Sequence, residues 1–161
     1  MSIQRQLRVF ERTLDVMNGE RHGLKIAFAT SDMRRVDQHF GSAERFVIYS
    51  VEPSRTTLLE VAQFGSLAQD GNENKLLEKL VVLEGCAAVY CQAVGGSAVR
   101  QLLSLGVQPF KVPEGTGVLV LLNTLQQELR AGTGWATRAL ARMKDKDDQR
   151  FDAMEAEGWE E

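Results

Sequence analysis

The order of the apolar runs along the chain limits its fold more than any other feature. Three runs stand close together at residues 24–29 (LKIAFA), 45–51 (RFVIYSV) and 56–64 (TTLLEVAQF), and each is typical of a β-strand. Their close spacing favours an antiparallel meander, because antiparallel neighbours need no long crossover connection. We therefore predict three consecutive antiparallel strands in the first half of the chain.

The second half of the chain alternates between helical and strand patterns. We predict helix, strand, helix, strand and helix in that order, at residues 72–83, 87–91, 95–105, 107–112 and 116–129. Helix-linked strands should pair in parallel through right-handed crossovers. Pro109 cannot donate to a central ladder, which places its strand at an edge. In the last helix we expect an inward face made by Val120, Leu121, Leu125 and Leu129. The whole pattern predicts a mixed α/β sheet.

The two ends of the chain differ from this central part. Residues 1–21 predict an amphipathic helix, with a narrow apolar seam made by Leu7, Phe10, Leu14 and Met17. Residues 22–132 form the predicted core domain. Residues 133–161 are charge-dense, with large apolar groups too sparse for a core of their own, so we expect a charged tail that is a frayed helix or disordered.

Composition and charge exclude several classes of protein. The net charge of −3 over 161 residues argues against general nucleic-acid binding. No apolar run approaches the roughly 18 residues of a membrane span, and the charged start lacks the apolar core of a secretory signal. The two cysteines are too few for a disulfide framework or an all-cysteine cluster site. These features favour the cytoplasm.

The polar loop at residues 30–43 is the first candidate site. His39 offers an imidazole nitrogen to a metal, and Asp37 is close enough in sequence to orient that ring. Arg34 and Arg35 favour an anionic ligand. The alternative is an ordinary surface loop whose histidine binds nothing.

The second candidate site follows the strand at residues 87–91. Cys91 stands where that strand ends, and ligands of open α/β sheets gather at the carboxyl ends of strands. Gly95, Gly96 and Ser97 open a helix whose free N–H groups can bind an anion. The alternative is that Cys91 is a small buried apolar residue, and we favour that interpretation for Cys86.

Familiar enzyme signatures are missing from the sequence. There is no G-x-S-x-G elbow and no H-E-x-x-H motif. The strand at residues 24–29 carries no carboxylate, although a metal-dependent nuclease on such a sheet would place acidic residues there. We therefore expect a protein that is not an enzyme, and we disfavour a nuclease or phosphotransferase.

Several segments together resemble a known family. These are KIAFAT, VDQHFG, ERFVIYSVE and CAAVYCQAVGGSAVRQLLSLGVQPF, which lie in this order within residues 24–130. They resemble the dinitrogenase iron–molybdenum cofactor-binding family. The resemblance implies a ribonuclease H-like mixed sheet, with three antiparallel strands followed by alternating helices and strands, and here an added N-terminal helix.

The resemblance also implies a function and a ligand set. The expected cargo is an iron–sulfur precursor of the nitrogenase cofactor, the NifB-derived cluster, and the mature iron–molybdenum cofactor is a further candidate. His39 is the expected cluster ligand and Cys91 a second one, while Arg34, Arg35 and the Gly95–Ser97 turn would neutralise charge. Expected partners are the cluster donor, the assembly scaffold and apo-dinitrogenase. The alternative is a protein-binding chaperone for apo-nitrogenase or the scaffold, without a cluster site.

Overall fold

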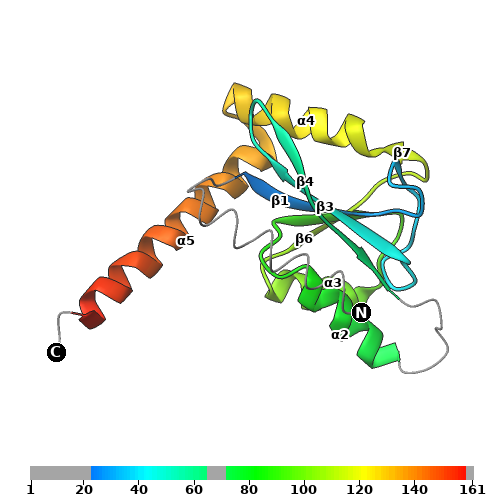
Figure 1. The fold of residues 1–161 in the computed structure, drawn as a ribbon, viewed down its shortest axis with the longest axis horizontal. Helices are drawn as coiled ribbons and strands as arrows, with labels where there is room; N and C mark the ends of the chain where they lie inside the picture. Colours follow the sequence, from blue (N-terminus) through cyan, green and yellow to red (C-terminus); the bar gives the residue numbers. More distant parts are fainter. Residues whose placement is uncertain (1–22, 65–71, 159–161) are drawn as a thin grey trace.

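A mixed five-stranded sheet lies at the centre of the computed structural model, which describes residues 23–64 and 72–158 (Figure 1). The strand order is β4-β3-β1-β5-β6. The bounds of these strands, in that order, are Thr56–Gln63, Arg45–Val51, Leu24–Ala29, Ala88–Cys91 and Gln108–Lys111. The three apolar runs that open the chain therefore form one half of the sheet, and the later strands form the other half.

The first half of the sheet is the predicted antiparallel meander. β3 pairs with β1 along the whole length of β1, from Leu24 opposite Val51 to Ala29 opposite Phe46. β4 pairs antiparallel with β3, and the register shifts by a bulge next to Ile48. The prediction of three consecutive antiparallel strands is confirmed.

The second half of the sheet is parallel. β5 pairs with the central strand β1, and β6 pairs with β5 and forms the edge, as Pro109 predicted. The connections carry α2 (Asn72–Val82) and α3 (Gly96–Ser104). Both helices were predicted to within a residue or two. Strand order and direction define a mixed α/β fold, and its assignment as ribonuclease H-like stays a prediction.

Helices cover both faces of the sheet, and Figure 1 shows α2 and α3 on one side and α4 (Val118–Ala131) on the other. The side chains of β1 alternate between the two layers, since Ala27 and Ala29 belong to one buried cluster and Ile26 and Phe28 to the other. A strand buried on both faces explains why LKIAFA reads as a continuous apolar run.

The inward face of α4 differs from the prediction. Val118, Leu122 and Leu125 are its buried residues, at the i, i+4 and i+7 spacing of one helical face. Val120, which we expected to face inward, is 60% exposed. The run from Val118 to Leu122 is apolar all round, so its pattern does not choose a face. In α2, Leu80 is buried but Leu77 is exposed, and Leu83 just after the helix is buried.

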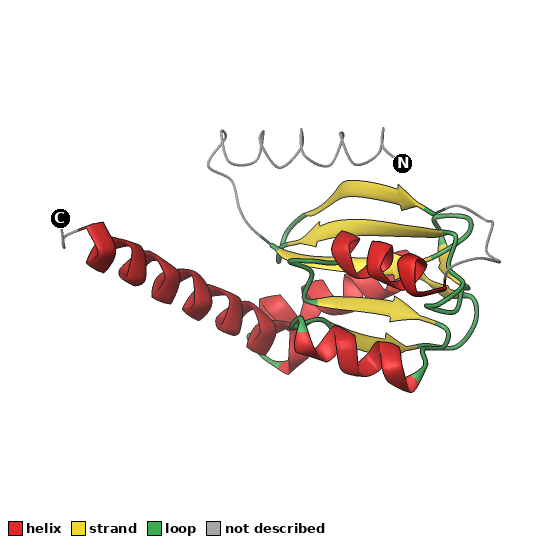
Figure 2. Cartoon of the chain, turned by 90° about the horizontal axis from the view of Figure 1, so that it is seen from below, coloured by secondary structure: helices red, strands yellow, loops and turns green. Residues whose placement is uncertain are grey.

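The chain after α4 forms one long helix, α5 (Gly134–Gly158), which leaves the body of the molecule (Figure 2). Its first turns are part of the core, because Ala136 and Ala139 are buried and Trp135 packs against the same cluster. The core thus continues past the boundary that we predicted at residue 132. Residues 144–150 are all exposed, as expected of a charged tail, and they are helical, which is one of the two forms that we predicted.

The predicted N-terminal helix at residues 1–21 lies outside the described residues. Within the described part of the chain, no helix combines the length and the apolar character that crossing a membrane requires.

Candidate functional site

The candidate site lies where the parallel strands β1, β5 and β6 end. Because parallel strands point the same way, their carboxyl ends meet at one edge of the sheet. The register aligns Phe28 with Tyr90 and Cys91 with Lys111 at this edge. The loops that follow β1 and β5 therefore emerge side by side, and these are the two segments that the sequence singled out.

The loop after β1 is built on Thr30 and Asp32. Thr30 is fully buried, and its hydroxyl oxygen accepts the backbone N–H of Met33 at 2.9 Å. The Asp32 carboxylate accepts the backbone N–H groups of Arg34 and Arg35 at 2.8 and 2.9 Å. These bonds hold Met33 in a left-handed conformation with φ of 67°. The loop is thus shaped by its own polar side chains.

The same bonds set the charge state of the loop. The backbone N–H groups of Arg34 and then Arg35 lower the pKa of Asp32, because they stabilise the carboxylate form. Asp32 is therefore ionised throughout the neutral range. The guanidinium of Arg35 comes only to 3.9 Å from this carboxylate, and both groups are exposed, so the ion pair is weak.

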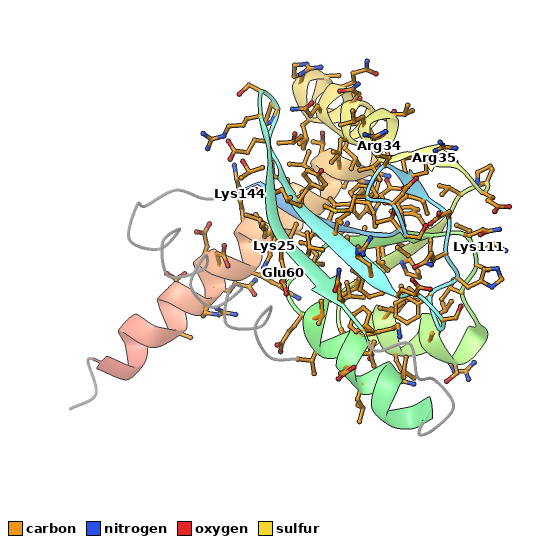
Figure 3. The ribbon with its side chains drawn as sticks, turned by 45° about the vertical axis from the view of Figure 1, so that its right-hand side comes forward. Lys25, Arg34, Arg35, Glu60, Lys111 and Lys144 are labelled. Carbon is orange, nitrogen blue, oxygen red and sulfur yellow. The ribbon has the colours of Figure 1, made fainter. Side chains whose placement is uncertain are left out.

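A short ribbon, which the sequence did not predict, fixes the far side of the loop. β2 (Arg35–Val36) pairs antiparallel with β7 (Thr116–Gly117), just before α4. The N–H of Val118 also donates to the carbonyl oxygen of Arg34 at 2.8 Å. Two-residue strands carry too little pattern to be found in a sequence. Through this ribbon the arginines lie beside the start of α4 (Figure 3).

Asp37 holds the loop closed rather than orienting His39 as we had expected. Its carboxylate accepts the backbone N–H of Ser31 at 2.9 Å and the Ser31 hydroxyl at 2.6 Å. Both carboxylate oxygens are engaged across the neck of the loop. Asp37 therefore belongs to the framework that positions the loop.

His39 is exposed and lies beside the loop that follows β5. It forms an isolated parallel bridge with Ala93. Two backbone bonds flank this bridge, from Phe40 N–H to the Ala93 oxygen at 2.8 Å and from Gln92 N–H to the Gln38 oxygen at 2.9 Å. The neighbouring Phe40 is fully buried and anchors the segment. The structure therefore brings the two predicted loops together.

Cys91 has a different environment from the one that a metal ligand needs. It is fully buried, and burial raises the pKa of its thiol to about 11 although Lys111 acts in the opposite direction. The thiol lies 3.8 Å from the carbonyl oxygen of Phe110, within hydrogen-bonding distance for sulfur. The side chain is a neutral thiol in the core, in line with the alternative interpretation. Cys86 is buried as well.

The start of α3 is open to solvent. Gly95, the residue that precedes the helix, gives no side-chain cap, and Gly95, Gly96 and Ser97 are all exposed. A helix start without a side-chain cap leaves backbone N–H groups for water or for an anion. This turn lies two residues from Ala93 and hence close to the His39 segment.

Lys111 is a further candidate residue that the sequence analysis missed. It is exposed at the end of β6, directly opposite Cys91 in the register. Arg34, Arg35 and Lys111 lie on the same side of the molecule (Figure 3). The position of Lys111 near the end of the predicted strand at residues 107–112 was the signal in the sequence that could have identified this residue.

The described residues contain no group of three or more His, Cys, Asp or Glu side chains that could hold a metal ion. They include one exposed imidazole, the cationic side chains of Arg34, Arg35 and Lys111, and an uncapped helix start at one end of the sheet. Such a set suits an anionic ligand that brings most of its own bonding partners.

Comparisons with known proteins agree with the resemblance. A model of the family described as "Dinitrogenase iron-molybdenum cofactor" matches residues 23–128. The chain therefore belongs to this family. The region matched includes the His39 loop, the strand that ends at Cys91, and most of α4.

Individual relatives narrow the comparison. Protein NifX of Azotobacter vinelandii is 54% identical over 153 residues, which cover 93% of this chain and 97% of that protein. Protein NifX of Klebsiella pneumoniae is 38% identical over 115 residues, or 71% and 73% of the two chains. FeMo cofactor biosynthesis protein NifB of A. vinelandii is 31% identical over 97 residues, which are 57% of this chain and 19% of that protein. These relatives support a role in the biosynthesis of the nitrogenase iron–molybdenum cofactor.

A solved structure shares the fold. The apo form of the orange protein from Desulfovibrio gigas aligns with a TM-score of 0.50 at 18% identity, covering 68% of this chain and 92% of that one. This likeness concerns the fold alone.

Proposed function

We propose that this protein is a carrier that binds an iron–sulfur precursor of the nitrogenase cofactor, the NifB-derived cluster, and passes it on in the cytoplasm without acting as an enzyme. The observation that carries the proposal is the position of His39. Its imidazole is exposed, and its backbone is bonded to the loop that leads to the open start of α3. Arg34, Arg35 and Lys111 add positive charge on the same side of the molecule.

A small ligand set suits a carrier. A preassembled cluster brings its own sulfides, so it needs few protein ligands, whereas four thiolates would retain it. One imidazole with surrounding cations and backbone N–H groups would bind such an anion reversibly. The mature iron–molybdenum cofactor is a second ligand that the same groups could accept.

The ligand roles of the two predicted metal-binding residues are not equal. We propose His39 as the anchor, because its side chain is exposed. Cys91 would have to leave the core and lose its proton before it could coordinate iron, since it is buried with a pKa of about 11. Arg34, Arg35, Lys111 and the Gly95–Ser97 turn would then balance the charge of the cluster.

The decisive experiment is an anaerobic titration with the isolated NifB-derived cluster, followed by visible absorption and bound iron. We expect stoichiometric uptake by the wild type and by His22→Ala, which removes the other histidine of the chain. His39→Ala should lose most of the uptake, because the anchoring bond is gone. Equal uptake by His39→Ala would rule out the imidazole-anchored carrier.

A protein-binding chaperone is the second candidate function. Its support is the helical arm after residue 143, in which residues 144–150 are all exposed and which extends away from the sheet (Figure 2). Binding of apo-dinitrogenase by the wild type, lost when residues 144–161 are removed, would favour this function if the titration shows no cluster uptake.

A further inference from the structure

Large apolar side chains are exposed next to the candidate site. On the first turn of α4, Leu119 is 70% exposed and Val120 is 60% exposed. Met33, in the loop after β1, is 37% exposed. The bond from Val118 N–H to the carbonyl oxygen of Arg34 ties this turn to that loop. We call Met33, Leu119 and Val120 the rim patch.

The conformation of Met33 is held in place by the loop. A residue other than glycine in the left-handed region costs about 1 kcal/mol, and here the Thr30 hydroxyl and the Asp32 carboxylate stabilise it. The result is an apolar side chain that is held partly in solvent. The rim patch joins exposed apolar side chains of two bonded segments beside the candidate site, which makes it a candidate for protein docking.

The charged groups beside the rim patch limit the kind of protein that could dock there. The formal charges of the loop balance, with Asp32 and Asp37 against Arg34 and Arg35. Asp37 accepts N–H and O–H groups of the loop with both carboxylate oxygens, and Asp32 does so with Oδ1, while its Oδ2 is 3.9 Å from the Arg35 guanidinium in a weak ion pair. The groups left for a partner are the exposed guanidinium groups of Arg34 and Arg35. A matching surface would therefore have an apolar centre bordered by carboxylates.

We propose that the rim patch, with Arg34 and Arg35, docks the protein that delivers the cluster, and that loading the cluster weakens this contact. This rests on the proposed carrier function. An anionic cluster at His39 and the carboxylates of a partner would compete for the same guanidinium groups. The surface therefore fits a partner that binds the carrier before the cluster is loaded, which is the donor. By linkage, bound cluster then lowers the affinity for the donor, and bound donor lowers the affinity for the cluster by the same factor.

The test measures the affinity of the carrier for the purified apo form of its NifB-type donor, under anaerobic conditions at two salt concentrations. We expect Leu119→Gln/Val120→Gln to weaken donor binding by about tenfold. The control Leu103→Gln changes a residue that is 51% exposed near the far end of α3, and it should leave the affinity unchanged. Carrier loaded with precursor should bind the donor about fivefold more weakly than empty carrier, and higher salt should weaken both.

The outcomes separate this proposal from the carrier function. Uptake of the isolated cluster tests the carrier alone, and the rim-patch variant should retain that uptake because both of its substitutions lie outside the ligand set. Unchanged donor affinity in this variant, or equal affinity of empty and loaded carrier, would overturn the docking proposal while leaving the carrier intact. Circular dichroism confirms that each variant is folded.

Discussion

At the scale of single residues, the carboxylates of the loop after β1 hold the backbone of that loop in its conformation. Asp32 and Asp37 bind backbone N–H groups and the Ser31 hydroxyl, which leaves the arginines and His39 as the exposed functional groups. The sequence singled out this segment but could not divide its polar residues into those that shape the loop and those left for a ligand. That division depends on which hydrogen-bond donors the folded backbone places next to each carboxylate.

The buried thiol of Cys91 gives a first prediction. With a pKa of about 11, roughly one thiol in a thousand is ionised at pH 8. Iodoacetamide should therefore label Cys91 very slowly in the native protein and rapidly in denaturant, with mass spectrometry of peptides as the readout. The Cys86→Ala variant isolates Cys91 for this measurement. Fast native labelling would show that the strand end opens, and would restore Cys91 as a candidate ligand.

The same shift predicts a loss of stability at alkaline pH. The folded pKa lies above the ordinary value of 9.0, so the contribution is present below pH 9 and is lost as pH rises from about 9 to 11. A shift of about two units corresponds to roughly 2–3 kcal/mol in the free energy of unfolding. Urea unfolding from pH 8 to 11 should show a smaller decline for Cys91→Ala than for the wild type. Parallel curves would contradict the burial of the thiol.

At the scale of elements, the elbow between α4 and α5 depends on Glu128 and two glycines. Gly132 and Gly134 have positive φ values of 72° and 80°. The Glu128 carboxylate accepts the N–H of Ala136 at 2.8 Å, and its carbonyl oxygen accepts the Thr137 hydroxyl. This elbow sets the direction in which α5 leaves the body (Figure 1).

Alanine at each glycine separates two effects. A Cβ at Gly132 meets nothing within 4 Å, so Gly132→Ala should cost only the conformational term of about 1 kcal/mol. A Cβ at Gly134 would lie 2.6 Å from the Glu128 carboxylate and push it off Ala136, which adds about 1 kcal/mol for the lost hydrogen bond. Denaturant unfolding measures both variants. Equal destabilisation would mean that the Glu128 contact contributes nothing.

At the scale of the whole molecule, α5 has two parts. Its first turns complete the core through Ala136, Ala139 and Trp135, whose ring contacts Phe110 edge to face. The later turns carry exposed charged residues and leave the body (Figure 2). These exposed turns bury little surface against the sheet, so the body should not need them.

Two truncations test this division. Removal of residues 144–161 should leave the melting temperature within a few degrees of the full chain, since residues 144–150 are exposed. Removal of residues 133–161 also deletes Trp135, Ala136 and Ala139, and should cost about 3 kcal/mol or more. Thermal unfolding followed by circular dichroism gives both values. A large loss from the shorter deletion would place essential contacts in the arm.

The sequence by itself determined the five strands of the main sheet and their directions, and it singled out the two loops of the candidate site. Apolar periodicity reports burial directly, and the spacing of runs decides whether a connection can be a crossover. It did not determine the face of α4, because the run that begins at Val118 is apolar all round. Nor could it show the pairing of β2 with β7, which joins residues about 80 positions apart through only two residue pairs.

Only the tertiary structure decided which predicted ligands are accessible. The sequence made both His39 and Cys91 candidate ligands, with His39 in a polar loop and Cys91 at the end of an apolar run. The fold leaves His39 exposed at a bridge to Ala93 and encloses Cys91 between the sheet and its covering helices. Accessibility depends on what the other layers cover, and this is a property of the packed molecule rather than of any local pattern.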